Sequence, residues 1–192
     1  MSRLILASSS PFRKAILDKL NIVYEAVSPD IDETRLDSET PQHYVARLAR
    51  EKAEALQTDY PDALIIGSDQ TAIINGKTIG KPGSFDNACQ QLREASGKKI
   101  TFLTGLSLLN SQTGSCETDV IPFHVYFRHL TPTMIENYLT AEQPYNCAGS
   151  FKSEGLGIAL FEKLEGDDPN ALIGLPLIRL IRMLENQGIN VI

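Results

Sequence analysis

The sequence predicts an α/β protein built on a mixed, twisted sheet with flanking helices. Short apolar runs of strand length alternate along the chain with amphipathic segments of helical period, which is typical of this class. Two hairpin signals, the Asn75-Gly76 pair and a polar turn at residues 111–115, interrupt the alternation, so part of the sheet is expected to be antiparallel. Neither GxGxxG nor GxxxxGK[ST] occurs, so the fingerprints of the dinucleotide fold and the P-loop are absent.

The first half of the chain begins with a strand that runs directly into a helix. Residues 4–7 are apolar, Ser10 is a preferred N-cap residue, and Pro11 stands at the first helical position. The remaining elements predicted in this half are a strand at 22–26, a polar loop at 28–39, a helix from Thr40 and Pro41 to about 57, and short strands at 63–67 and 71–74.

The second half is predicted to contain the longest strands and the final helix. Its elements are a helix at 86–95, strands at 100–109 and 116–127, a helix from Thr131 and Pro132 to about 139, and a helix at 177–185. Residues 149–176 are rich in glycine and include the acidic run 165–170, so we expect a long loop there. Loops of this kind often carry binding residues.

Length and charge narrow the class of protein. With 192 residues, we expect a single domain over residues 1–192, built as two lobes that share one core. The net charge of −6 argues against a protein whose main task is to bind a nucleic-acid backbone, because such binding relies on neutralising phosphates. A local group of cations still suits a small anionic substrate.

Cysteine use and hydropathy favour a cytoplasmic protein without a membrane partner. Cys89, Cys116 and Cys147 form no CxxC pair, so neither a disulfide framework nor a zinc site is expected. No apolar run approaches the roughly 20 residues of a membrane helix. The N-terminus lacks the pattern of a secretory signal.

The stretch LASSSPFRK admits two interpretations. Ser10 caps a helix, and Arg13 and Lys14 are then ordinary surface cations. Alternatively, Ser8, Ser9 and Arg13 surround a phosphate at the helix N-terminus, where free amides and the helix dipole favour an anion. The stretch alone does not separate the two.

Two other polar positions stand in a chemically suggestive context. Asp69 follows a buried apolar run and is expected at the end of a strand, as a metal ligand, a general base or a simple turn residue. Lys81 lies in a Gly-Lys-Pro-Gly corner that either aims it at a phosphate or leaves it as an exposed turn residue.

Taken in order, these segments resemble the Maf family of nucleoside triphosphate pyrophosphatases. The resemblance spans the chain and rests on the series LASSSPFRKAIL, IDET, ARLAREKA, IIGSDQ, IGKPG, the Thr104-Gly105 step, AGSFKSEGLG and EGDDPNALIGLPL. It implies a fold of the Maf and inosine triphosphatase type, with two lobes around a nucleotide cleft. It also implies cleavage between the α- and β-phosphates, a divalent cation (Mg or Mn), removal of non-standard nucleotides, and a possible homodimer.

The resemblance also assigns roles to individual residues. Asp69 takes the role of general base, and Asp69 and Glu33 are expected to hold the metal. The phosphates are expected to face Lys52, Lys81, Ser8, Ser9 and Arg13. Such a set suits phosphoryl chemistry, which depends mostly on positioning and on charge stabilisation.

Three positions depart from the commonest pattern of the family. Phe12, Gln70 and Glu154 stand where many members have Arg, Thr and Gln, and this trio resembles the subgroup that prefers 7-methyl-GTP over dTTP and UTP. A 7-methylated guanine is cationic, so Phe12 would gain about 0.5–2 kcal/mol by stacking on it. The carboxylate of Glu154 would accept from the N1–H and 2-amino group. Gln70 would supply a further polar contact.

Two alternatives stay open at this stage. The same reaction on UTP, dTTP or another non-standard nucleotide uses the same phosphate-facing residues. The second alternative is a nucleotide-binding regulator of cell division with little catalytic activity. The combination of Asp69, Lys52 and Lys81 argues against this alternative.

Overall fold

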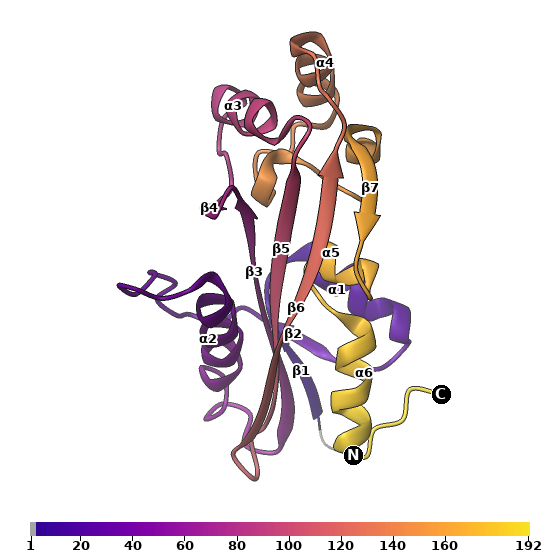
Figure 1. Ribbon diagram of the computed structural model, residues 1–192. Helices are drawn as coiled ribbons and strands as arrows, with labels where there is room; N and C mark the ends of the chain where they lie inside the picture. The colour runs from indigo at the N-terminus through magenta and orange to yellow at the C-terminus, as the bar shows by residue number, and fades with distance from the viewer. Residues whose placement is uncertain (1–2) are drawn as a thin grey trace. The chain divides into compact units, whose positions relative to one another are not determined.

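The computed structural model describes residues 3–192, which are traced in Figure 1 and form two compact units. Unit 1 contains the chain up to Gln70 together with Thr104–Ile121 and Asp168–Ile192. Unit 2 contains Thr71–Leu103 and Pro122–Asp167. Among the described residues, no helix combines the length and the apolar character that crossing a membrane requires.

The elements alternate between strands and helices, as expected for an α/β chain. The strands are β1 (Arg3–Ala7), β2 (Glu25–Val27), β3 (Ala63–Ile74), β4 (Lys77–Ile79), β5 (Lys99–Asn110), β6 (Ser115–Phe127) and β7 (Phe161–Glu165). The α-helices are α1 (Pro11–Leu17), α2 (Pro41–Glu54), α3 (Phe85–Ala95), α4 (Pro132–Glu142), α5 (Pro169–Ile173) and α6 (Leu177–Asn186). Short 3₁₀ helices lie at Asp18–Leu20, Ala148–Ser150 and Leu156–Leu160.

The mixed sheet predicted from the sequence is confirmed. Within the described chain it has seven strands in the order β2-β1-β3-β5-β6-β7, with β4 paired to β3. β1 pairs in parallel with β2 and β3, whereas β3–β4 and β6–β7 are antiparallel. The β3–β4 hairpin turns at Asn75 and Gly76, both with positive φ, as the sequence predicts.

In unit 1, β1 and the first part of β3 are buried on both faces, and side-chain alternation divides the core around them in two. Leu4 and Leu6 lie in register with Leu64 and Ile66, and these four pack with residues of α1 and α6. The intervening residues Ile5, Ala7, Ala63 and Ile65 pack on the other side against Ala53 and Leu56, at the end of α2. Figure 1 shows α2 and α6 on opposite sides of the unit 1 strands.

The backbone of α2 lies directly on two glycines of adjacent strands. A Cβ atom at Gly67 of β3 would lie 1.9 Å from the carbonyl oxygen of Ala49, and one at Gly105 of β5 would lie 2.1 Å from that of Val45. These distances are far below van der Waals contact, so only glycine permits the approach. The two glycines therefore set the distance between α2 and the strands that it covers.

Unit 2 has an aromatic centre of its own. Phe102, Phe127, Phe151 and Phe161 form a connected set of edge-to-face pairs, with ring centroids 4.9–5.5 Å apart. This geometry is favourable for aromatic pairs because the positive edge of one ring meets the negative face of another.

Several helix starts are confirmed, whereas several other predicted boundaries are wrong. Ser10, Thr40 and Thr131 each cap a helix whose first residue is proline. The strand predicted at 22–26 is shorter and lies later in the chain, as β2, Glu25–Val27. The segment 149–176 is not one loop, because it contains β7 and α5, which begins after the N-cap Asp168.

The strands predicted at 63–67 and 71–74 are in fact one strand, β3, with Asp69 in its interior and not at its end. The sequence suggested a break because Ser68, Asp69 and Gln70 are polar. The strand continues through them because each of these side chains finds a hydrogen-bonding partner in the folded chain.

Replacing Gly67 by alanine tests the contact between α2 and the sheet. Gly67→Ala is expected to lower the free energy of unfolding by about 1–3 kcal/mol, because the neighbouring atom is backbone and has little room to yield. Gly80→Ala is the matched control, because a Cβ there meets nothing within 4 Å and φ is not positive. Urea unfolding of both variants is the measurement, and equal midpoints would contradict the contact.

Candidate functional site

Unit 1 contains a buried ammonium group that lies between two carboxylates. The Nζ atom of Lys52 lies 2.7 Å from Oδ1 of Asp69 and 2.7 Å from Oε1 of Glu33. Lys52 and Asp69 are buried, whereas the side chain of Glu33 is 56% exposed. The structure thus brings together three residues that the sequence analysis placed in the site.

Each of the three comes from a different element. Asp69 lies two residues after Gly67 on β3, so strand alternation directs it to the same side, where α2 lies. Lys52 is one turn of α2 after Ala49, whose carbonyl oxygen lies over Gly67. Glu33 comes from the irregular segment before α2. The close approach of α2 therefore brings the ammonium within reach of the strand.

The charges around Asp69 compensate one another. Burial raises the pKa of Asp69 above its ordinary value, while the positive charges of Lys52 and Arg13 act against that rise. Burial lowers the pKa of Arg13, and the carboxylates of Asp69 and Glu33 oppose this. The direct partner of the Asp69 carboxylate is Lys52, and the charge of Arg13 adds a further favourable interaction.

In the serine-rich stretch after β1, the hydroxyl groups of Ser8 and Ser10 make hydrogen bonds within the fold. The Oγ of Ser10 accepts from the backbone N–H of Arg13, which confirms the predicted cap. The Oγ of Ser8 accepts from the N–H of Ser10 and, at 3.5 Å, from the guanidinium of Arg13. The Ser8 hydroxyl keeps a donor hydrogen that neither bond uses. Ser9 is exposed, and Phe12 is half-buried.

The side chain of Arg13 is held in place by its Nε, which donates to the carbonyl of Gly174 over 2.8 Å. The same carbonyl accepts from Ser68 Oγ over 2.9 Å. Gly174 follows α5 and has φ +126°, a conformation that favours glycine. NH1 of Arg13 lies 3.5 Å from the Oγ of Ser8, and the negative charges of Asp69 and Glu33 act on the guanidinium.

Gln70 has a structural task that the sequence did not reveal. Its Nε2 donates to Oγ1 of Thr104 over 3.0 Å and to the carbonyls of Ala171 and Leu172 over 2.8 and 3.0 Å. Thr104 also donates to Ala171. The side-chain amide nitrogen of Gln70 therefore holds the end of α5, and its oxygen Oε1 is the atom left for a ligand.

Ser68 and Thr104 are polar residues of this region to which the sequence analysis gave no role in the site. Both are fully buried and anchor the backbone around Gly105, Ala171 and Gly174. The Thr104-Gly105 step was a signal in the sequence, but without the fold it gave no indication of these partners.

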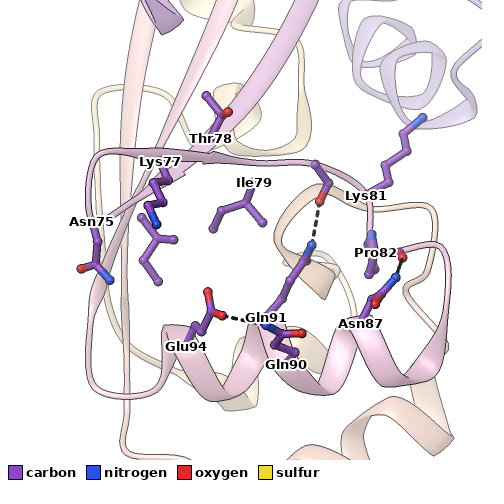
Figure 2. Close-up of a pocket in the computed structure, with 12 residues that line it drawn as sticks. Asn75, Lys77, Thr78, Ile79, Lys81, Pro82, Asn87, Gln90, Gln91 and Glu94 are labelled. Atoms are coloured by element: carbon purple, nitrogen blue, oxygen red, sulfur yellow. Dashed lines mark hydrogen bonds between the residues drawn. The ribbon is translucent and has the colours of Figure 1, made fainter.

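Lys81 and Glu154 belong to unit 2. Lys81 is exposed at the edge of a pocket of about 560 Å³ that the β3–β4 hairpin and α3 line. Figure 2 shows that its side chain points away from α3. The turn that carries it is fastened on both sides, because Gln91 donates to the carbonyl of Gly80 and Asn87 to that of Pro82. The backbone at Lys81 is therefore well defined although its ammonium is exposed.

Glu154 lies in a loop that is held by the last residue of α4. One carboxylate oxygen of Glu142 accepts from the N–H of Leu156 over 2.8 Å, and Lys152 donates to the Glu142 carbonyl over 3.0 Å. Glu154 itself is exposed and accepts from Ser153 Oγ over 3.3 Å. The carboxylate is thus presented on a fastened loop and keeps acceptor capacity for a ligand.

Comparison with known proteins places the chain in a family. Residues 3–187 match the family described as Maf-like protein. The 7-methyl-GTP pyrophosphatase of Aliivibrio fischeri is 59% identical over 191 residues, which are 100% of this chain and 99% of that protein. The 7-methyl-GTP pyrophosphatase of Pseudomonas syringae pv. tomato is 55% identical over 191 residues, with 100% of both chains covered.

A solved structure shows a more distant similarity. A HAM1 protein from Coxiella burnetii covers 66% of this chain and 73% of its own, at 17% identity and a TM-score of 0.47, which is too low to support an argument. The family match and the relatives, by contrast, extend over almost the whole sequence. This protein therefore belongs to the family of Maf-like proteins.

Proposed function

We propose that this protein is a nucleoside triphosphate pyrophosphatase that hydrolyses 7-methyl-GTP to the nucleoside monophosphate and pyrophosphate. The observation that carries the proposal is the buried Lys52 ammonium shared by Asp69 and Glu33. Buried charges of this kind gather at functional sites more often than elsewhere. The name shared by the full-length relatives supplies the reaction and the substrate.

In this proposal Asp69 orients the attacking water and takes up its proton. Hydrolysis adds one water across the bond between the α- and β-phosphates, so one proton must be accepted while pyrophosphate leaves. Asp69 is suited to this task because burial raises the pKa of its carboxyl group, which makes it a stronger base than an exposed aspartate. Lys52 and Arg13 stabilise negative charge on the phosphates, and Lys81 is proposed to do the same.

The residues present also fit a divalent cation. Glu33 and Asp69 offer carboxylate oxygens, the ligands that Mg²⁺ and Mn²⁺ prefer, and both already neutralise one shared cation. Among the described residues, no group of three or more His, Cys, Asp or Glu side chains forms a metal cluster. Mg²⁺ commonly binds through one or two carboxylates and completes its shell with water and substrate phosphate. A bound metal would supply water of lowered pKa and neutralise phosphate charge.

The selection of the base is assigned to Phe12 and Glu154, with Gln70 in support. A half-buried aromatic ring suits stacking on the cationic 7-methylguanine, and an exposed carboxylate suits its N–H donors. Gln70 would offer its Oε1 and not its nitrogen, because the nitrogen holds α5.

Asp69→Asn tests the general base. The variant is expected to lose about 10²–10⁴-fold in turnover, because an amide accepts no proton while its oxygen still accepts from Lys52. Pyrophosphate release from 7-methyl-GTP with Mg²⁺ or Mn²⁺ is the measurement, with thermal unfolding as a check on folding. Asp119→Asn, at an exposed partner of Arg179, is the control and keeps full activity. Full activity of Asp69→Asn would exclude the assigned role.

Combining Phe12→Arg with Glu154→Gln tests base selection. The double variant is expected to lose activity on 7-methyl-GTP relative to UTP and dTTP, because it loses the ring that stacks on a cationic base and the carboxylate that attracts it. The measurement is the ratio of kcat/KM values between these substrates, which is insensitive to a general loss of active protein. A ratio equal to that of the unmodified protein would remove both residues from the specificity set.

A further inference from the structure

The position of Glu33 needs an explanation, because its surroundings are not those of a rigid element. Residues 28–40 form neither a helix nor a strand, and the Glu33 side chain is 56% exposed. An exposed side chain on irregular backbone has many accessible conformations, and ordering it costs conformational entropy. Its Oε1 nevertheless lies 2.7 Å from Lys52. Something other than local secondary structure must hold this backbone.

The contacts that hold it come from one face of α2. The Tyr44 hydroxyl donates to the carbonyl of Glu33 over 3.0 Å, and NH2 of Arg47 donates to the carbonyl of Thr34 over 3.2 Å. Tyr44 and Arg47 are three residues apart and therefore neighbours on the helix surface. Two consecutive carbonyls of the loop, one of them that of Glu33, are thus fixed to the helix that also carries Lys52.

Arg47 is itself fixed by a bidentate ion pair with Glu39. Its Nε and NH2 donate to the two carboxylate oxygens of Glu39, over 2.7 and 2.9 Å, and its NH1 donates to Glu51 over 3.0 Å. The Glu39 side chain is only 7% exposed and also accepts from the N–H of Leu36. Paired contacts between guanidinium and carboxylate are among the strongest hydrogen bonds and fix orientation as well as distance.

The charge on Glu39 agrees with this geometry. The hydrogen bond from Arg47 is the largest cause that lowers the pKa of Glu39 to about 2. Glu39 therefore stays ionised over the whole range in which an enzyme is assayed, and the pair with Arg47 persists. Glu39 lies at the end of this segment next to α2, and Glu33 and Thr34 lie near its middle, so Arg47 connects two parts of the segment.

We propose that Arg47, fixed by its bidentate ion pair with Glu39, is a positioning residue. It holds residues 30–39, the Glu33 loop, so that the Glu33 carboxylate contacts the Lys52 ammonium. The inference rests on the proposed function, in which Glu33 helps to hold the metal. Arg47 acts through Glu33 and touches neither substrate nor metal, and nothing in the family resemblance or in the names of the relatives assigns it this role.

Arg47→Gln is the principal test, because glutamine keeps polarity but loses the charge and the paired contact. The variant is expected to lose about 10–100-fold in kcat/KM and to need more Mg²⁺ for half-maximal rate, as when a residue behind a metal ligand is removed. Hydrogen exchange of residues 30–39 is expected to accelerate. Arg50→Gln is the matched control, because it breaks only an exposed pair with Glu54 on the same helix, and it leaves all three properties unchanged.

A double-variant cycle with Glu33→Gln decides whether Arg47 acts through Glu33. If it does, adding Arg47→Gln to Glu33→Gln produces almost no further loss of rate, because the carboxylate to be positioned is already gone. A loss as large as in the unmodified background would overturn the proposal, and so would unchanged exchange in residues 30–39. Should Arg47→Gln fail to fold, Glu39→Gln removes the other partner of the Arg47–Glu39 ion pair. The same changes in rate, Mg²⁺ requirement and hydrogen exchange are expected of that variant.

Different measurements test the role of Arg47 and the proposed function. If the unmodified protein releases no pyrophosphate from any nucleoside triphosphate with Mg²⁺ or Mn²⁺, the proposed function is wrong. The role of Arg47 in catalysis falls with it, while hydrogen exchange still decides whether Arg47 holds the loop. If the unmodified protein is active and the cycle is additive, only the positioning role is excluded.

Discussion

The approach of α2 to the sheet at Gly67 and Gly105 is the constraint on which the charged centre of unit 1 depends. A side chain at either glycine would overlap the carbonyl oxygen of Ala49 or Val45 and force the helix away. Lys52 lies on the same helix one turn after Ala49, so its ammonium reaches Asp69 only because the backbones lie this close. The same helix carries Tyr44 and Arg47, which fasten the Glu33 loop.

The buried pair of Lys52 and Asp69 is better explained by chemistry than by stability. Removing two charges from water is costly, and an apolar pair of similar volume often stabilises a protein as well or better. A carboxylate of raised pKa is, however, well suited to activate water, and the positive charges of Lys52 and Arg13, which act on it, are suited to neutralise phosphate. The polar residues on the opposite side of β3, Ser68 and Gln70, anchor α5 and the Gly174 carbonyl that holds Arg13.

Local signals in the sequence were reliable where short-range contacts decide the structure. The caps at Ser10, Thr40 and Thr131 and the turn at Asn75 and Gly76 involve residues within a few positions of one another. The division of β3 into two strands was wrong for the opposite reason. Polar residues suggest a break unless their partners are known, and those partners lie far away in the chain.

The sequence by itself determined which charged residues are present, their order, the mixed α/β class and the membership of the family. Only the tertiary structure decided that Lys52 lies between Asp69 and Glu33, that Gln70 donates to carbonyls of α5, and that Arg47 donates to the carbonyl of Thr34. The reason is chain distance, because Lys52 and Asp69 are 17 residues apart and Gln70 and Ala171 are 101 apart. Periodicity and propensity report only on near neighbours, whereas these contacts exist only once α2, β3 and α5 have packed together.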